Sequence, residues 1–277
     1  MLSVTSSGLA RTIATLALAS VVTVGASGCG DASPGGSSDQ PSSGASEPAV
    51  PVSTPEIVAE HPWDASSFTQ GVEMAPDGTL VVGTGMYGES RIYRTTLDNQ
   101  QSDSQKLDSE YFGEGNTIHG DDVWQLTWKK GTAFRRDLET LEEKGTVNYE
   151  GEGWGICSTG EQLVMSNGSG TLTFRDPETF APTGTVDVTL GGEATSQLNE
   201  LECADDGSVF ANVWQTDLIY KIDPSSGEVT EMIDTVDAFP AADRPGADVL
   251  NGIAKIPGTD HYLLTGKYWD TAYEVRF

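Results

Sequence analysis

The sequence predicts an all-β protein folded as a five-bladed β-propeller, and three observations support this prediction. From Pro55 onward, short β-prone runs alternate with turns rich in Gly, Asp and Pro. No apolar stripe with helical spacing extends beyond a turn or two. Units with a similar layout recur five times along the chain, at a spacing of roughly 40 to 50 residues, which is the period of propeller blades.

The five units share the same order of runs. A first run reaches a turn such as Pro76-Asp77-Gly78, and a second, a third and an outer run follow, which predicts a four-stranded antiparallel meander in each unit. The unit starts lie at residues 68–71, 112–115, 151–154, 198–201 and 250–253.

The last unit stops at Phe277, directly after its third run, and so lacks an outer strand of its own. Residues 56–59 precede the first unit and belong to none. We therefore expect this N-terminal strand to close the last blade, which would also cover a sheet edge that is otherwise open to aggregation. A sixth blade would need a further unit, and no residues are left for one.

The N-terminal region predicts export. Arg11 precedes an apolar run over residues 12–24, and small residues lead to Cys29, so residues 1–29 are typical of a secretory signal. Cys29 stands where a bacterial lipobox has its lipidated cysteine, although Ala26 replaces the usual leucine. The apolar run is too short for a transmembrane helix. We expect an outward-facing membrane lipoprotein, attached only through this lipid anchor, with plain secretion as the alternative.

Residues 30–54 are rich in Gly, Ser and Pro and show no periodicity, which predicts a flexible tether ahead of a propeller over residues 55–277. The chain carries 15 basic and 42 acidic residues, a formal net charge of −27. Nucleic acids and anionic membrane surfaces would repel such a chain, so neither is an expected partner.

Three histidines and three cysteines are too few to build a zinc site easily from protein ligands, and the histidines are not at metal-ligand spacing. We expect neither a metal nor a cofactor. If Cys29 is lipidated, Cys157 and Cys203 remain. An exported protein could pair them, and two isolated buried thiols are an equally good interpretation of the sequence.

The inner strands of a propeller line a central channel, and ligand sites gather at one mouth of it. The unit starts and the ends of the second runs should meet there. These positions carry one acid, two amides, one lysine and a set of aromatic residues. They are Phe68, Gln70, Phe112, Glu114, Trp128, Trp154, Asn199, Trp214 and Lys267.

Each of these residues also has a structural interpretation. The tryptophans could pack between blades, the amides could satisfy backbone groups, and Glu114 and Lys267 could be surface charges. The functional interpretation is favoured because all nine recur at equivalent places in the units. Glutamates 152, 200 and 202 sit in similar places, and we expect at least one of them to bond amides of a neighbouring blade.

Several short motifs are spread over the units. They are FTQG from Phe68, TGMYGES from Thr84, YFGEG from Tyr111, LTWK from Leu126, GEGWG from Gly151, LNELE from Leu198, ANVWQTD from Ala211, LNGIA from Leu250 and TGKYW from Thr265. Together they resemble the motifs of plant-type glutaminyl cyclases. The resemblance covers about residues 55–277 and involves every unit. The chain departs from the family pattern at two places: Cys203 follows LNELE, and Ile156-Cys157 follow GEGWG.

The resemblance implies membership of the glutamine cyclotransferase family, whose bacterial and plant members are five-bladed propellers. They convert N-terminal glutaminyl residues of peptides or proteins to pyroglutamate, release ammonia and need no metal. By this resemblance Glu114 would be the catalytic residue and the other eight pocket residues would bind substrate. We further expect a monomer. Two alternatives stay open: a tethered ligand-binding propeller without catalysis, and a propeller hydrolase, which usually displays metal-binding acids and histidines in its channel.

Overall fold

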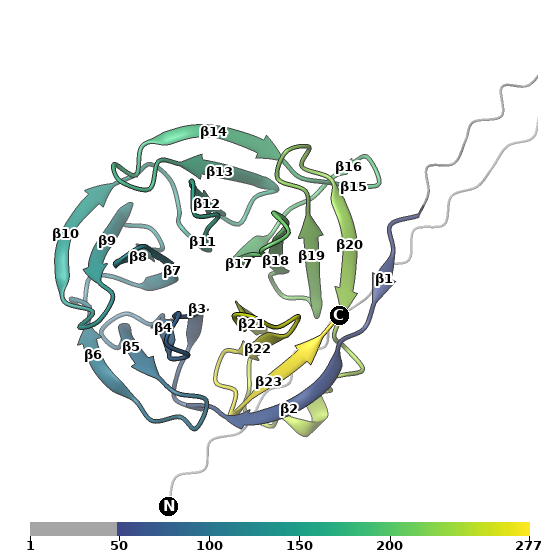
Figure 1. Ribbon diagram of the computed structural model, residues 1–277, viewed down its shortest axis with the longest axis horizontal. Coiled ribbons are helices and arrows are strands. Elements are labelled where there is room, and N and C mark those ends of the chain that lie inside the picture. Colours follow the sequence, from purple (N-terminus) through teal and green to yellow (C-terminus); the bar gives the residue numbers. More distant parts are fainter. Residues whose placement is uncertain (1–48) are drawn as a thin grey trace, which may run out of the picture. The chain divides into compact units, whose positions relative to one another are not determined.

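The strands form five antiparallel sheets around a common centre in the computed structural model, which describes residues 49–277 (Figure 1). Blade 1 contains β3 (Thr69–Met74), β4 (Leu80–Thr84), β5 (Arg91–Thr95) and β6 (Ser102–Lys106). Blade 2 contains β7 (Gly113–His119), β8 (Asp122–Thr127), β9 (Thr132–Asp137) and β10 (Glu143–Asn148). Blade 3 contains β11 (Ile156–Ser158), β12 (Leu163–Met165), β13 (Thr171–Arg175) and β14 (Pro182–Asp187).

Blade 4 contains β17 (Leu198–Cys203), β18 (Val209–Val213), β19 (Leu218–Ile222) and β20 (Val229–Asp234). Blade 5 contains β21 (Leu250–Lys255), β22 (Tyr262–Gly266), β23 (Thr271–Arg276) and β2 (Glu56–Pro62). A two-stranded hairpin, β15 (Thr189–Leu190) with β16 (Glu193–Ala194), follows blade 3, and a short 3₁₀ helix over Ala241–Asp243 precedes blade 5. The predicted five-bladed β-propeller is confirmed.

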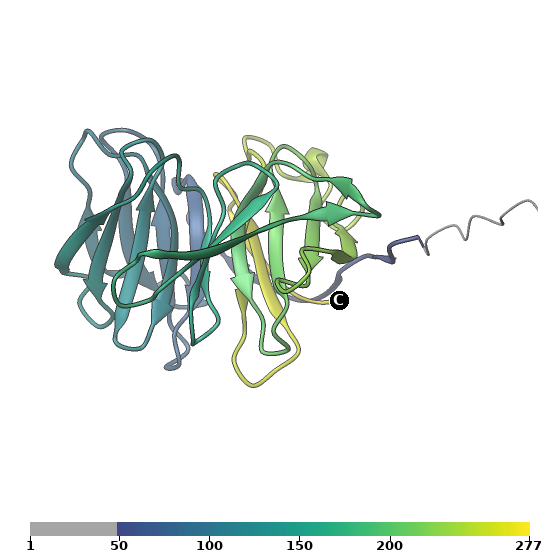
Figure 2. The same cartoon turned by 90° about the horizontal axis from the view of Figure 1, so that it is seen from above.

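Burial decreases from the second strand of a blade to its outer strand. All residues of β4, β8, β18 and β22 are buried, whereas the outer strand β6 is almost entirely exposed. The sequence follows this gradient, with LVVGT in β4 and SDSQK in β6. Seen from the side, the strands run between the two faces of the ring, so the loops gather on those faces (Figure 2).

A separate hydrophobic cluster fills each of the five interfaces between neighbouring blades. Between blades 1 and 2, for example, Val81 packs with Val123, and both side chains are fully buried. Trp63 and Val72 pack with Leu263 where blade 1 meets blade 5. The ring is therefore held by apolar burial at every interface, including the one between the first and the last blade.

The N-terminal strand β2 is the outer strand of blade 5. It pairs antiparallel with β23, with Glu56 opposite Arg276 and Pro62 opposite Thr271. Side chains reinforce this pairing, because Arg276 Nη2 donates to Glu56 Oε2 at 2.7 Å. His61 of the same strand lies 3.2 Å from Glu274 of β23.

The last residues of the predicted tether form a short strand. Val52 and Ser53 form β1, which pairs parallel with β20 on the outside of blade 4. Both residues fall within the segment 30–54 that the sequence suggested to be a tether. The pairing needs only main-chain groups, so the composition of the segment did not reveal it. The predicted signal region and Cys29 lie outside the described residues.

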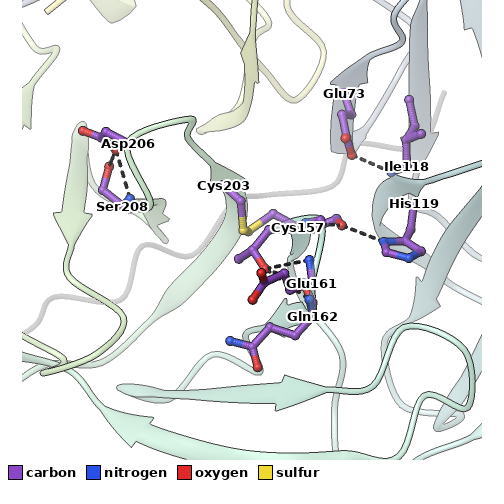
Figure 3. The surroundings of a disulfide bond; sticks show 12 residues. Glu73, Ile118, His119, Cys157, Glu161, Gln162, Cys203, Asp206 and Ser208 are labelled. Carbon is purple, nitrogen blue, oxygen red and sulfur yellow. Dashed lines mark hydrogen bonds between the residues drawn. A yellow bond between two sulfur atoms is a disulfide. The ribbon is translucent and has the colours of Figure 1, made fainter.

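Cys157 and Cys203 form a disulfide, with their Cα atoms 5.4 Å apart (Figure 3). It joins β11 of blade 3 to β17 of blade 4, and both cysteines lie on innermost strands. Of the two interpretations that the sequence left open, the structure has the paired one. The two departures from the family motifs are thus the two halves of one covalent link. Among the described residues, no helix has the length and apolar character needed to cross a membrane.

Candidate active site

A cavity of about 230 Å³ opens at the face where the inner strands begin, which we call the pocket mouth. This volume is below the roughly 300–1,000 Å³ of sites for drug-sized ligands and suits a single amino-acid residue. Its lining brings together all nine residues predicted from the sequence. They are Phe68, Gln70, Phe112, Glu114, Trp128, Trp154, Asn199, Trp214 and Lys267.

Three polar residues reach the pocket from irregularities in the inner strands. The register of β3 shifts between Thr69 and Gly71, that of β7 between Gly113 and Asn116, and that of β17 between Leu198 and Leu201. The residues within these shifts include Gln70, Glu114 and Asn199. A β-bulge turns a side chain away from the regular alternation of a strand, so these shifts direct polar groups into the channel rather than between the blades.

The ends of the second strands supply the next set of positions. In four blades, the residue directly after the second strand donates its backbone N–H to the carbonyl of the residue directly before the inner strand. The pairs are Gly85 to Phe68, Trp128 to Phe112, Trp214 to Gln197 and Lys267 to Val249, at 2.9–3.0 Å. The residue directly after the second strand is therefore structurally equivalent in these four blades. It is Gly85 in blade 1, and in the other three it is Trp128, Trp214 or Lys267, which this position brings to the pocket mouth.

The aromatic residues are half-buried and form the walls, whereas the four polar residues are buried and form the floor. The rings meet edge to face: Phe68 lies 6.0 Å from Phe112, and Phe112 lies 5.6 Å from Trp128. On the opposite side, Trp154 and Trp214 are 5.4 Å apart at 84°. Edge-to-face pairs of this kind favour particular tilts and spacings of the rings.

Two glycines make room for these rings. A Cβ atom on Gly85 would lie 2.4 Å from the Phe112 ring, and one on Gly168 would lie 2.5 Å from the Trp154 indole. Gly168 also has a φ of +80°, which other residues adopt only at a cost. The positions of Phe112 and Trp154 thus depend on the absence of a side chain at these two places.

Glu114 is buried, with 5% of its surface exposed. Burial is the main cause that raises the pKa of its carboxyl well above the ordinary value of 4.5, while Lys267 acts to lower it and Glu152 to raise it. Within the described residues, no donor forms a hydrogen bond to this carboxyl group. A buried carboxyl with a raised pKa and free oxygens, facing a cavity, is suited to proton transfer.

Lys267 lies over the ring of Phe68, with Nζ 4.7 Å from the ring centroid. Burial lowers the pKa of its ammonium group, and the nearby Glu114 and Asp248 carboxylates act in the opposite direction. Asn199 is fixed through its backbone carbonyl, which accepts a hydrogen bond of 2.6 Å from the Ser166 hydroxyl. The pocket thus places an amine and two amide groups around the same small space as Glu114.

Sequence reasoning missed Asn251, which lies in the register shift of β21 between Leu250 and Ile253. Its Nδ2 donates to the Thr69 carbonyl at 3.0 Å and lies 3.4 Å from Gln70 Oε1. This contact turns the oxygen of the Gln70 amide toward Asn251. The sequence did contain a signal for Asn251: it is the second residue of LNGIA, as the predicted pocket residue Asn199 is the second residue of LNELE.

The expectation for the three further glutamates is met by Glu200. Its Oε1 accepts from the Val72 N–H at 3.4 Å and its Oε2 from the Ile253 N–H at 2.9 Å, so it ties blade 4 to blades 1 and 5. Glu152 instead contacts two pocket tryptophans. In the part of the chain that the structure describes, no three His, Cys, Asp or Glu side chains are arranged to hold a metal ion.

Comparison with known proteins agrees with this geometry. The family model for glutamine cyclotransferase matches residues 33–277. A glutaminyl-peptide cyclotransferase from Arabidopsis thaliana is 36% identical over 226 residues, which cover 80% of this chain and 70% of the plant protein. The crystal structure of Myxococcus xanthus glutaminyl cyclase aligns with a TM-score of 0.76 at 35% identity, over 83% of this chain and 98% of that one. The chain belongs to the glutamine cyclotransferase family.

Proposed function

We propose that this chain cyclises N-terminal glutaminyl residues of peptides or proteins to pyroglutamate with release of ammonia. The observation that carries this proposal is the Glu114 carboxyl, which is buried and accepts no hydrogen bond from residues 49–277, in a cavity of about 230 Å³ within a chain of this family. The cavity accommodates one residue, and the remainder of a peptide extends out through the mouth.

Confinement supplies much of the catalysis. The attacking α-amine and the side-chain amide carbon belong to the same residue, so the reaction needs one rotamer rather than two molecules. The rigid rings of Phe112, Trp128 and Trp154 restrict the bound side chain to compact rotamers. They also exclude water, which strengthens electrostatic interactions inside the pocket.

Proton transfer is assigned to Glu114. The neutral α-amine attacks the amide carbon and forms the new C–N bond, and the attacking nitrogen gives a proton to the Glu114 carboxylate. Glu114 passes that proton to the departing nitrogen, the old C–N bond breaks and ammonia leaves. A raised pKa suits this role because the group must both accept and donate a proton near neutral pH.

The amide oxygen gains negative charge during the attack. Lys267, Asn199 and Gln70 are the buried donors around the cavity that are available to stabilise this charge. The contact of Asn251 with the Gln70 oxygen leaves the Gln70 N–H₂ group as the part that faces substrate. These steps use side chains alone, and we propose that the reaction needs neither a metal nor a cofactor.

The test is ammonia release from a Gln-initiated dipeptide by the purified protein, with and without a chelator. We expect turnover in both, with pyroglutamate as the second product, and no ammonia from the same peptide acetylated at its amine. Turnover lost on chelation would contradict the mechanism. Binding without turnover for every Gln-initiated peptide would favour a non-catalytic ligand-binding propeller.

We also propose that the protein is exported and works outside the cytoplasm, as a lipoprotein anchored through Cys29 or as a secreted monomer. The Cys157–Cys203 disulfide supports export, because such bonds persist in oxidising compartments. All nine pocket residues come from one chain, which is compatible with a monomer. Mass spectrometry of the protein purified from membranes would test the lipidation, and light scattering would test the monomer.

A further inference from the structure

One oxygen of Glu152 accepts hydrogen bonds from two pocket tryptophans. Trp128 Nε1 donates to Glu152 Oε2 at 2.7 Å, and Trp154 Nε1 donates to the same atom at 3.0 Å. Trp128 follows the second strand of blade 2, and Trp154 precedes the inner strand of blade 3. A single carboxylate oxygen therefore links wall residues that two different blades supply.

The second oxygen of Glu152 lies 3.7 Å from Lys129 Nζ, and that ammonium group lies 3.8 Å from the Trp128 ring centroid. The ion pair is about half-exposed, so solvent screens it and it contributes little to stability. Hydrogen bonds to a charged acceptor are stronger than neutral ones. The two indole contacts are thus the interactions through which Glu152 acts on the pocket.

Among residues 49–277, the two indoles share Glu152 as their acceptor. Within the described residues, each Nε1 forms its hydrogen bond to Glu152 alone. The ring contacts of Phe112 with Trp128 and of Trp154 with Trp214 favour particular tilts and distances, but they do not involve the indole N–H groups. The shared acceptor holds both N–H groups on one oxygen and so sets the spacing between Trp128 and Trp154.

We propose that Glu152 is a positioning residue for the cyclisation, which holds the Trp128 and Trp154 indoles at the spacing that confines the glutaminyl side chain. This inference rests on the proposed function. Glu152 does not line the cavity and takes no proton in the reaction.

The charge of Glu152 has a second, smaller effect on Glu114. The charged and titratable groups that act on or respond to Glu114 are Lys267, Glu152 and Tyr149. Glu152 raises the pKa of Glu114, whereas Lys267 lowers it. Removing the negative charge of Glu152 should therefore move the acidic limb of the kcat profile to lower pH.

Two variants separate the hydrogen bonds from the charge. Glu152→Gln keeps an acceptor oxygen and loses the charge, and Glu152→Ala loses both. We expect kcat/KM to fall about 10- to 100-fold in Glu152→Ala, mostly through kcat, because misplaced rings no longer confine the reacting rotamer. Glu152→Gln should stay within about threefold of the wild type at its own pH optimum and show the shifted acidic limb.

Glu150→Gln is the matched control, since Glu150 is exposed, lies in the same loop and undergoes the same charge change. It should leave kcat/KM and the pH profile unchanged. Tryptophan emission gives a readout that does not need turnover. We expect a red shift and a broader band in Glu152→Ala, and a wild-type spectrum in Glu152→Gln and Glu150→Gln.

Wild-type emission and wild-type kcat/KM in Glu152→Ala would overturn the proposal, as would a Glu152→Gln variant that is as impaired as Glu152→Ala. If Glu152→Ala does not fold, the spectrum, kcat and pH profile of Glu152→Gln decide the question. If the wild type turns over no Gln-initiated peptide while the emission shifts as expected, the positioning of the rings stands and the proposed function fails.

Discussion

Glu114 in β7 and Glu200 in β17 are the same residue type, both buried and both within a register shift of an inner strand, yet their carboxyl groups have opposite surroundings. Burial is the main cause that raises the pKa of each. Glu200 accepts backbone hydrogen bonds from two other blades, whereas Glu114 accepts none from the described residues. Burial alone therefore does not distinguish a carboxyl that is available to a ligand from a structural one.

The same contrast extends to the two ends of the inner strands. At the pocket mouth, aromatic rings surround a cavity together with the Glu114 carboxyl, which accepts no hydrogen bond from the described residues. Toward the other end, Glu73 accepts from the Ile118 N–H at 2.7 Å, and the Cys157–Cys203 disulfide joins two strands. Burial raises the pKa of Glu73 to about 7. One end thus keeps polar groups available to a ligand, and the other uses them to connect blades.

The largest effect is expected from Glu114→Gln, which keeps the shape of the side chain and removes the proposed proton carrier. We expect kcat to fall by about 100-fold or more. The variant should also be more stable than the wild type at neutral pH, because the wild type must bury an ionisable carboxyl. Near-normal kcat in this variant would contradict the role of Glu114.

The sign of that stability difference depends on pH. Below about pH 4.5 the group is protonated in folded and unfolded chains, so the two proteins should melt alike. As the pH rises, the unfolded chain ionises first, since the folded-state pKa is raised, and the wild type loses stability relative to Glu114→Gln. The gap in Tm should widen with pH up to the folded-state pKa and then stay constant.

The second effect concerns Glu200→Ala, which leaves the N–H groups of Val72 and Ile253 without an acceptor. We expect a loss of about 2–5 kcal/mol in the free energy of unfolding. The folded fraction should keep kcat within a few-fold of the wild type, because Glu200 does not line the cavity. A stable Glu200→Ala protein with greatly reduced kcat would contradict the structural role of Glu200 and show that it acts in catalysis.

The third effect concerns the disulfide, which closes a loop of sequence separation 46. Replacing both cysteines with alanine should cost about 2–4 kcal/mol of stability, measured by chemical unfolding. A reducing agent should lower the Tm of the wild type and leave that of the double variant unchanged. Activity below the transition should be unaffected, and its loss would show that the two ends are coupled.

The smallest effect is expected from Gly168→Ala, with Gly160→Ala as its matched control. Both glycines have φ near +80°, so the backbone conformation should cost each substitution about 1 kcal/mol of stability. Only Gly168 faces the Trp154 indole, whereas a Cβ on Gly160 would meet nothing within 4 Å. We expect a raised KM in Gly168→Ala alone; equal kinetics in the two variants would show that Trp154 tolerates displacement.

Much of the fold could be predicted because a propeller is a repeat. Each unit buries its second strand and exposes its outer one, so the pattern LVVGT followed later by SDSQK appears in the sequence itself. The pocket residues were predictable for the same reason. Gln70 and Glu114 are the third residues of their units and Asn199 is the second, and these neighbouring positions converge in space once the units form a ring.

Pairings between distant segments could not be predicted in the same way. The contacts of Glu152 with Trp128 and of Asn251 with Gln70 depend on distances between blades, which no local pattern encodes. The strand at Val52–Ser53 pairs through main-chain groups and leaves no side-chain signature. The disulfide stayed one of two interpretations because spacing alone does not say whether two cysteines meet.

The sequence by itself determined the number of blades and which residues surround the cavity, because these follow from periodic local patterns, and its motifs resembled those of one family. Only the tertiary structure decided which buried glutamate is free and which is bonded. That difference depends on where the backbone N–H groups of other blades lie: in the described part of the chain, those of Val72 and Ile253 reach Glu200, and none reaches the Glu114 carboxyl. Hydrogen bonding between segments far apart in the chain is a property of the closed ring.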